Sequence, residues 1–210
     1  MAFVTTHLVK HPLVGERLAS MRSVGTDNAT FRAALHEMAT MLVYEALRDA
    51  PSETFPVTTP IQETLGVRLS NPPLLVPVLR AGLGMASAVQ NLLPNAQMGF
   101  VGLARDEQTH EPRAYMESLP ATLRNRPVLV LDPMLATGGS LVHCVRLLLD
   151  RGATDITVLC VLAAPSGLER LEECGVPLDV YTASVDERLN EHAFIVPGLG
   201  DAGDRQFGAV

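Results

Sequence analysis

The sequence predicts an α/β fold in which a mostly parallel sheet is flanked by helices. Short apolar segments, typical of strands, alternate with segments of helical character along most of the 210 residues. The strand-like segments are apolar at nearly every position, as expected when helices cover both faces of a sheet. No internal repeat or low-complexity segment interrupts the alternation, so we expect one domain over residues 1–210.

The elements follow one another in a regular order. Apolar residues recur at three- to four-residue spacing between residues 27 and 50, which predicts one long amphipathic helix that Pro51 ends. An N-terminal arm and this helix would occupy about residues 1–51. Beyond them we expect strands at 74–79, 98–104, 127–131, 155–164 and 178–184, and helices at 84–93, 139–151 and 166–174.

Two segments do not fit the alternation. Residues 105–120, RDEQTHEPRAYMESLP, are polar and lack a helical stripe, so we expect a projecting hairpin or flap. Residues 195–210, IVPGLGDAGDRQFGAV, are glycine-rich and too irregular for an ordinary helix. Long connections of this kind are usually functional or disordered.

The composition argues against two classes of partner. A net charge of −7 disfavours a nucleic-acid surface, because binding a phosphate backbone needs an excess of basic residues on one face. The most apolar stretch, residues 72–89, is broken by Arg80, glycines and prolines, so we expect no membrane span.

The three cysteines form no CxxC pair and are typical of reduced core residues, which predicts a cytoplasmic location.

The segment VLVLDPMLATGGS, residues 128–140, joins a buried strand to an acid and a small, hydroxylated loop. Ligands of an open parallel sheet bind beyond the carboxyl ends of the strands, which is where Asp132 lies. A helix starting near Gly139 offers free amides and the positive end of its dipole, so the loop can hold a monophosphate. Thr137 and Ser140 can donate from their hydroxyls, and Asp132 can accept from sugar hydroxyls. The alternative is a tight turn in which Thr137 or Ser140 only caps the helix.

Two arginines at strand ends indicate a second anion site. Arg80 follows directly on the apolar segment 74–79, and Arg105 stands at the end of the next strand, at the base of the flap. A guanidinium in such a place can direct its planar fork at phosphate oxygens. Each arginine alone could instead be a surface or ion-paired residue. Together with residues 132–140 they outline a pocket for one phosphate and one pyrophosphate.

These motifs resemble those of the type I phosphoribosyltransferases, and specifically the uracil phosphoribosyltransferase family. VLVLDPMLATGGS is similar to the family's motif for phosphoribosyl pyrophosphate, and VPVLRAGLGM and IVPGLGDAGDR are similar to segments of its uracil-specific members. HPLVGERL, YEALRD and YTASVDERLN extend the resemblance over nearly the whole chain. It implies the type I fold, with a flap at about 105–120 and a base-recognition loop at about 195–205.

The resemblance also implies the reaction and its partners. The 5-phosphoribosyl group would pass from phosphoribosyl pyrophosphate to N1 of uracil, giving UMP and pyrophosphate in pyrimidine salvage. Magnesium would be bound mainly through the pyrophosphate and water, so no metal ligands are expected among the side chains. At least a homodimer is implied, and GTP is a possible effector, although no sequence feature marks a GTP site.

Roles for individual residues follow from the same resemblance. The expected catalytic residues are Asp132, Arg105 and Asp201. Phosphoribosyl pyrophosphate would be bound by Arg80, Arg105, Asp132, Pro133, Met134, Leu135, Ala136, Thr137, Gly138, Gly139, Ser140 and Asp201. Uracil would be bound by Ile195, Gly200, Asp201 and Ala202, with Tyr181, Ile195 and Pro197 as apolar walls or, alternatively, as ordinary packing residues. Pro133 stands where many type I motifs carry a second acid, and the group that takes the N1 proton, Asp201 or a water, stays open.

A glycine-rich loop suits recognition of uracil. Uracil presents a carbonyl, an NH and another carbonyl along one edge, and backbone amide and carbonyl groups can match that order. Cytosine carries an amino group in place of one carbonyl and would set donor against donor, so we expect it to be rejected.

Other functions remain open from the sequence. GLGDAG (198–203) and GLGMAS (82–87) resemble dinucleotide fingerprints, but the first is too near the chain end for a βαβ unit and the second lacks the third glycine. A non-catalytic nucleotide sensor with this fold, or a transferase for another base, are the remaining alternatives.

Overall fold

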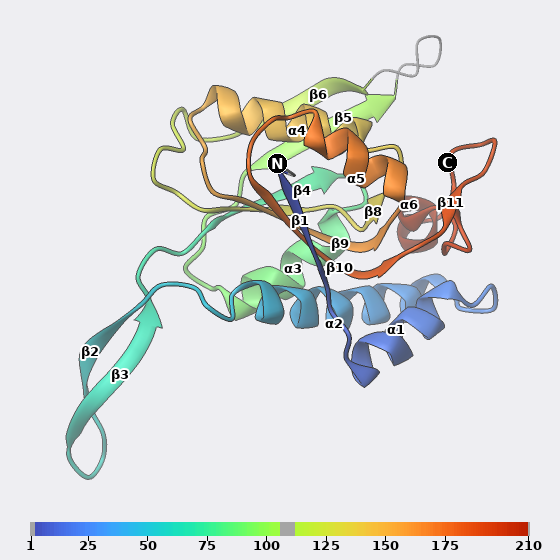
Figure 1. Cartoon of the computed structure of the whole chain (residues 1–210). Coiled ribbons are helices and arrows are strands. Elements are labelled where there is room, and N and C mark those ends of the chain that lie inside the picture. Colours follow the sequence, from blue (N-terminus) through green and yellow to red (C-terminus); the bar gives the residue numbers. More distant parts are fainter. Residues whose placement is uncertain (1–2, 106–111, 210) are drawn as a thin grey trace.

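The computed structural model describes residues 3–105 and 112–209 (Figure 1). Its central sheet confirms the predicted fold class, because every neighbouring pair of strands is parallel except β5 with β6. The strands lie in the order β1 (Val4–Leu8), β10 (Leu178–Val185), β9 (Ile156–Ala163), β7 (Val128–Leu131), β4 (Leu74–Leu79), β5 (Phe100–Arg105) and β6 (Pro112–Ser118), and the short β8 (Met134–Leu135) also pairs with β9.

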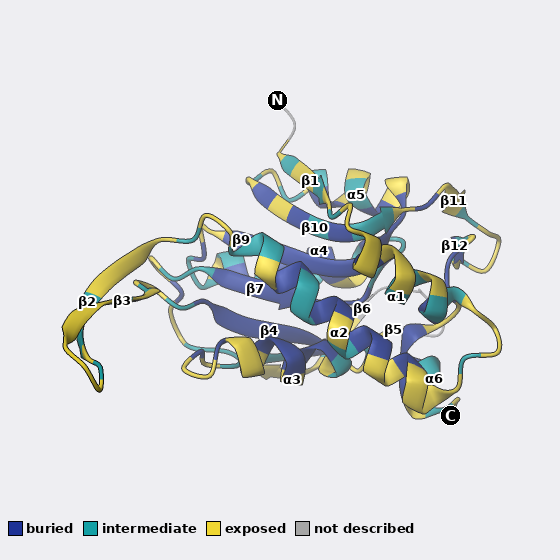
Figure 2. Cartoon of the chain, turned by 90° about the horizontal axis from the view of Figure 1, so that it is seen from below, coloured by how far each residue is buried: buried dark blue, intermediate teal, exposed yellow. Residues whose placement is uncertain are grey.

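Helices cover both faces of this sheet (Figure 2). Alternate strand residues point to opposite faces, so Leu75 and Leu129 join one core, whereas Val76 and Val130 join the other. This two-sided burial explains why the strands are apolar at every position. The first core packs under α1 (Pro12–Arg22), α2 (Asn28–Ala46) and α3 (Leu83–Leu92), and the second under α4 (Gly139–Asp150) and α5 (Pro165–Glu172).

The long helix α2 ends earlier than the sequence predicts. Its last helical residue is Ala46, and residues 47–49 form a turn. Pro51 disfavours the helical conformation of Ala50, the residue before it, so the helix cannot continue up to the proline. At the other end Asp27 caps the helix by accepting a hydrogen bond from the Thr30 amide at 2.7 Å. No helix in the described ranges is long and apolar enough to cross a membrane.

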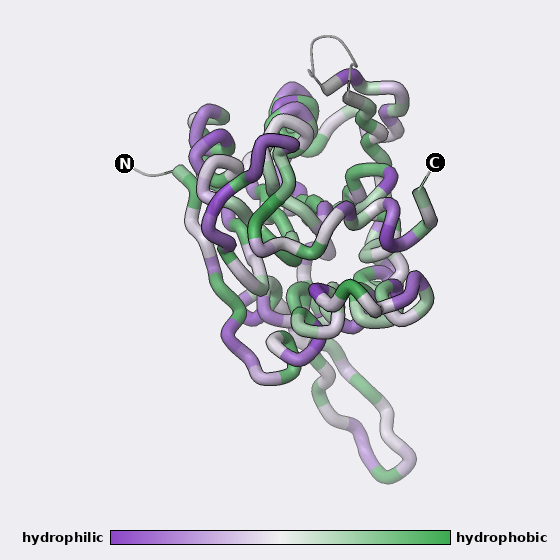
Figure 3. The backbone as a smooth tube through the Cα atoms, turned by 90° about the vertical axis from the view of Figure 1, so that its right-hand side faces the viewer, coloured by the Kyte–Doolittle hydropathy of each residue, from purple (hydrophilic) through white to green (hydrophobic). Residues whose placement is uncertain are grey.

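The N-terminal arm has more structure than expected. Its first residues form the edge strand β1, which pairs with β10, and α1 follows. The sequence also gave no indication of the antiparallel hairpin of β2 (Ser52–Thr58) and β3 (Glu63–Leu69), which projects from the body of the molecule (Figures 1 and 3). Leu65 and Val67 on this hairpin are about two-thirds exposed, at 68% and 69%.

The stem of the expected flap is a hairpin. Strands β5 and β6 are antiparallel, and Arg105 pairs with Pro112 at the end of the stem. Residues 106–111, which belong to the predicted flap, lie outside the described residues.

Candidate active site

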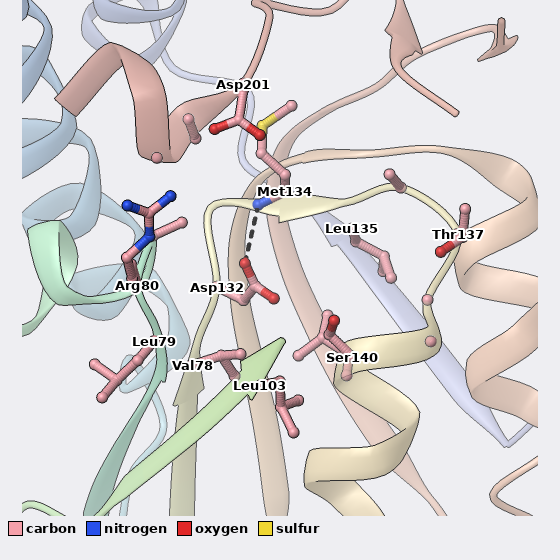
Figure 4. Close-up of a pocket in the computed structure, with 17 residues that line it drawn as sticks. Val78, Leu79, Arg80, Leu103, Asp132, Met134, Leu135, Thr137, Ser140 and Asp201 are labelled. Atoms are coloured by element: carbon pink, nitrogen blue, oxygen red, sulfur yellow. Dashed lines mark hydrogen bonds between the residues drawn. The ribbon is translucent and has the colours of Figure 1, made fainter. Parts of the chain in front are cut away.

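A cavity of about 330 Å³ opens at the carboxyl ends of β4 and β7. Five segments line it: the end of β4 and the turn after it with Arg80, Leu103 of β5, Asp132 after β7, residues 134–141 leading into α4, and residues 201–203 near the C-terminus. Figure 4 shows Arg80 on one side of Asp132, and Thr137 with Ser140 on the other. The structure therefore brings together Arg80, Asp132, Met134, Leu135, Ala136, Thr137, Gly138, Gly139, Ser140, Asp201 and Ala202, as the sequence predicts.

Of the other residues predicted for the anion sites, Pro133 lies outside the cavity lining, and Arg105 is described by its backbone alone. Pro133 does not line the cavity; its carbonyl accepts hydrogen bonds from the amides of Val161 and Leu162 and so fixes the turn after β7 on β9. The backbone of Arg105 ends β5, and Leu103 of the same strand lines the cavity. The side chain of Arg105 lies outside the described part of the structure.

The loop before α4 is built on Gly138. Its φ of +78° is left-handed, and a Cβ atom there would lie 2.9 Å from the carbonyl oxygen of Gly167. Gly138 is the N-cap residue, and no side chain caps the helix. The alternative that Thr137 or Ser140 only caps α4 is therefore wrong, and the amides of the first helical turn are available to an anion.

Replacing Gly138 with alanine is expected to weaken binding of phosphoribosyl pyrophosphate, the donor substrate that the sequence resemblance implies, by about tenfold. The free energy of unfolding should fall by about 1–2 kcal/mol, because a residue with a Cβ is strained in the left-handed conformation and this Cβ would press on the backbone of Gly167. Gly175→Ala is the matched control, since Gly175 also has a positive φ of +66° but open space around it. The Gly175→Ala variant should be less stable in thermal unfolding but should keep the wild-type KM for phosphoribosyl pyrophosphate. Equal donor affinity in both variants would argue against a phosphate site at this loop.

The turn that carries Arg80 packs directly on the end of β7. A Cβ atom at Gly82 would lie 2.1 Å from the carbonyl oxygen of Leu131 and 2.8 Å from that of Val78, so only glycine fits. The Gly82 amide also donates to the Val78 carbonyl at 2.8 Å, and the peptide bond between Leu79 and Arg80 is cis. This packing places Arg80 beside Asp132 (Figure 4).

Asp132 is the buried charge of the site, with 8% of its surface exposed. Burial raises its pKa to about 7, and repulsion from Asp201 acts in the same direction. A long contact of 3.5 Å from the Met134 amide partly opposes the shift. In the free site this carboxyl therefore titrates near neutral pH, and a cation beside it would favour its ionised form.

The C-terminal loop is held by an ion pair that the sequence did not reveal. Arg22 donates to both carboxylate oxygens of Asp186, at 2.7 and 2.6 Å, and to the carbonyl of Gly198 at 2.8 Å. Asp186 in turn accepts from the Gly198 amide at 2.9 Å. Burial alone would raise the pKa of Asp186, but hydrogen bonds from Arg22, Ser184 and Gly198 lower it below its usual value. Arg22 and Asp186 are 164 residues apart, and no local pattern joins them.

Arg205 ties the same loop to the turn between α1 and α2. Its guanidinium donates to the carbonyls of Leu199 at 3.0 Å and Ser23 at 2.8 Å, and it lies 4.7 Å from the centre of the Phe31 ring. Arg205 therefore anchors the loop to the body of the domain.

The segment 195–210 contains a helix that the sequence did not predict. Helix α6 (Ala202–Phe207) begins at Asp201, whose carboxylate accepts from the Asp204 amide at 2.8 Å. The cap and the contacts of Arg205 compensate for the weak helix propensity of Gly203 and Asp204. The preceding strand β12 (Ile195–Val196) pairs antiparallel with β11 (Arg188–Leu189), so GLGDAG does not lie in the βαβ unit of a dinucleotide site.

Tyr181 does not line this cavity, so the structure does not bring it together with Asp201 and Ala202, the other residues predicted to contact uracil that do. It stacks on His7 with ring centres 4.3 Å apart, and it lines a separate pocket with Asp155 and Asp179 at the amino ends of the strands. Tyr181 lies in the first half of β10, whereas ligands are expected beyond the carboxyl end. Ile195 is 5% exposed and Gly200 is exposed; both lie on the loop that leads to Asp201, but neither lines the cavity.

Comparison with known proteins agrees with this architecture. The sequence model of the uracil phosphoribosyltransferase family matches residues 8–209. A uracil phosphoribosyltransferase of Corynebacterium diphtheriae is 55% identical over 201 residues, which cover 96% of this chain and 95% of the relative. The solved structure of the AQ2163 protein from Aquifex aeolicus is 38% identical, with a TM-score of 0.92 over 98% of this chain and 99% of that one. A hypoxanthine phosphoribosyltransferase from Staphylococcus aureus, 14% identical with a TM-score of 0.50 over 76% of this chain and 75% of that one, shares the fold.

Proposed function

The chain belongs to the uracil phosphoribosyltransferase family, and we propose that the cavity beside Asp132 is where the 5-phosphoribosyl group passes from phosphoribosyl pyrophosphate to N1 of uracil, giving UMP and pyrophosphate. One observation carries the assignment of the site: an arginine after one strand, a buried acid with an amide-rich loop after the next, and the C-terminal loop all face one cavity. These are receptors for a pyrophosphate, a ribose phosphate and a base, in that order.

The loop from Asp132 to Ser140 would hold the ribose 5-phosphate. The free amides at the start of α4 suit a phosphate, and the hydroxyls of Thr137 and Ser140 can add donors. Asp132 would accept hydrogen bonds from the ribose hydroxyls. Arg80, and Arg105 on the neighbouring strand, would bind the pyrophosphate, and residues 200–202 would bind uracil.

Magnesium is part of this proposal, and the residues present fit a metal that arrives with the substrate. Asp132 and Asp201 both line the cavity, but residues 3–105 and 112–209 contain no group of three or more His, Cys, Asp or Glu side chains placed to hold a metal ion. Mg²⁺ often binds through one or two carboxylates together with substrate phosphates. When bound, it would neutralise negative charge on the pyrophosphate.

The reaction would be a displacement at the anomeric carbon. N1 of uracil attacks, the bond to pyrophosphate breaks, and the configuration at that carbon inverts. Positive charge develops on the ribose, so the ionised form of Asp132 would stabilise the transition state. Arg80 would stabilise the negative charge of the departing pyrophosphate. The N1 proton would leave to Asp201 or to a water molecule.

The function is tested by UMP formation from uracil, phosphoribosyl pyrophosphate and magnesium, run in parallel with cytosine, hypoxanthine and orotate. Turnover with uracil alone is expected. Turnover with a different base would agree with the fold and the type of reaction but contradict the proposed recognition of uracil by residues 200–202. No turnover with any base would favour a nucleotide sensor.

Replacing Arg80 with glutamine is expected to raise the KM for phosphoribosyl pyrophosphate about 10- to 100-fold, because charged hydrogen bonds to phosphate contribute about 1.5–3 kcal/mol each. The KM for uracil should change much less. Arg48→Gln is the control, because Arg48 is an exposed arginine that pairs with Glu45 at the end of α2. A larger effect on uracil than on the donor would remove Arg80 from the pyrophosphate site.

The partners and location are proposed on narrower grounds. The projecting hairpin β2–β3, with its exposed Leu65 and Val67, supports a homodimer or higher homo-oligomer, because such a two-stranded arm is marginally stable without a surface to pack on. The buried, unpaired Cys144 and Cys160 are consistent with a cytoplasmic location. The proposal that GTP is an effector rests on the family resemblance alone.

A further inference from the structure

We propose that Gln206 is a positioning residue that couples the Arg80 turn to the base loop, so that an occupied pyrophosphate site orders the uracil site. The inference rests on the proposed function, because it takes these two segments as the pyrophosphate and uracil receptors. It concerns a side chain that does not line the cavity.

A single amide group bonds to both walls of the cavity. Nε2 of Gln206 donates to the carbonyl of Ala81 at 3.0 Å and to the carbonyl of Ala202 at 2.7 Å. Ala81 follows Arg80, and Ala202 follows Asp201, so each bonded residue is adjacent to a charged residue of the cavity. Ala81 and Gln206 are 125 residues apart in the sequence. The amide orientation is set by these partners, because the opposite orientation would place Oε1 against two carbonyl oxygens.

The side chain is enclosed on every described side. Gln206 has 0% of its surface exposed, and its own carbonyl accepts from Arg32 of α2 at 2.6 Å. A Cβ atom at Gly84 of α3 would lie 1.8 Å from Oε1. Gly84 and Gln206 therefore fit only as a pair, and any displacement of α6 is transmitted to the start of α3 and the turn before it.

The position also carries a destabilising feature. Oε1 is buried and has no hydrogen-bond partner among the described residues. A buried carbonyl without a hydrogen-bond partner destabilises a fold. If the side chain only filled space, an apolar residue of the same size would make the protein more stable. The benefit that offsets this cost is the two donors of Nε2, which link the two loops.

The test uses magnesium pyrophosphate and uracil as separate ligands. Pyrophosphate and uracil are not joined by a ribose in this experiment. Any effect of one ligand on the affinity of the other therefore passes mainly through the protein. Isothermal calorimetry measures the uracil Kd with and without saturating magnesium pyrophosphate. In the wild-type protein we expect pyrophosphate to tighten uracil binding about fivefold or more. In Gln206→Met, which keeps the length but removes the donors, the ratio should fall close to one.

Two further variants separate positioning from stability. Gln206→Ala combined with Gly84→Ala places a methyl group where the longer side chain ended, so its melting temperature should recover relative to Gln206→Ala while the coupling ratio stays near one. Arg32→Met removes the bond to the Gln206 backbone and should lower the melting temperature while keeping the ratio. A merely structural role predicts the opposite, namely that the ratio follows the melting temperature in all variants.

The outcomes distinguish this inference from the proposed function. A wild-type ratio of one, or an unchanged ratio in Gln206→Met, overturns the coupling while both ligands still bind. If neither pyrophosphate nor uracil binds the wild-type protein, the proposed site itself is wrong and the coupling fails with it.

Discussion

Replacing Asp132 with asparagine is expected to lower kcat by about 10²- to 10³-fold and, at pH 8, to make the protein more stable than the wild type. The loss of activity follows from the loss of a carboxylate beside the carbon on which positive charge develops. Asparagine keeps the size and the oxygen that faces the Met134 amide, so the fold should be preserved. The measurements are steady-state kinetics with uracil as acceptor and thermal unfolding.

The gain in stability follows from the pKa of Asp132. Burial raises this pKa from 3.8 to about 7, so between these values the folded protein holds a proton that the unfolded chain has lost. The free energy of unfolding therefore falls as the pH rises from about 4 to 7, by an amount on the order of 4 kcal/mol for a pKa raised this far. Asparagine does not titrate and avoids this loss, so the variant should gain up to about that amount at pH 8.

The pH dependence provides the internal control. At pH 4 the folded wild-type protein carries a neutral Asp132, and the stabilities of the two proteins should converge. A variant with wild-type kcat would remove Asp132 from the catalytic residues. A variant whose stability relative to the wild type does not depend on pH would show that the carboxyl is not buried in its neutral form.

Uracil is expected to exceed cytosine in kcat/KM by about 10⁴-fold, because a site built on buried hydrogen bonds is left with unpaired groups when the wrong base enters. The loop cannot easily rearrange to accept cytosine. Both backbone groups of Gly198 are bonded, to Asp186 and Arg22, and the carbonyl of Leu199 is bonded to Arg205. Among the described residues the backbone groups of Gly200 and the amides of Asp201 and Ala202 have no hydrogen-bond partner in the chain, so they are free to face a base.

Arg22→Met tests whether the rigidity of the loop produces this selectivity. The variant removes the bond to the Gly198 carbonyl and the partner of Asp186, and it should lower kcat/KM for uracil more than for cytosine. Steady-state kinetics with each base, at a fixed saturating concentration of phosphoribosyl pyrophosphate, measure both effects. A ratio below about 10² in the wild-type protein, which a site without specific hydrogen bonds can produce, would contradict the proposed recognition by backbone.

The sequence by itself determined the fold class and the course of the loop from Asp132 to Ser140. Both depend on short-range order: each strand is a contiguous apolar segment, and residues from Asp132 to Ser140 follow one another from the end of a strand into a helix. The chain therefore carries this part of the site as one unit, whose geometry is set by local turn and helix rules.

Tertiary structure alone decided how the remaining parts meet. Tyr181 is only four residues before Val185, where β10 ends. It nevertheless lies near the amino ends of the strands, away from the cavity at their carboxyl ends, because an extended strand separates its two ends by its full length. The Arg22 and Asp186 pair and the bond from Gln206 to Ala81 join segments more than a hundred residues apart. Such contacts depend on how helices pack on the sheet, and this packing depends on the shape of the whole core rather than on any local pattern of residues.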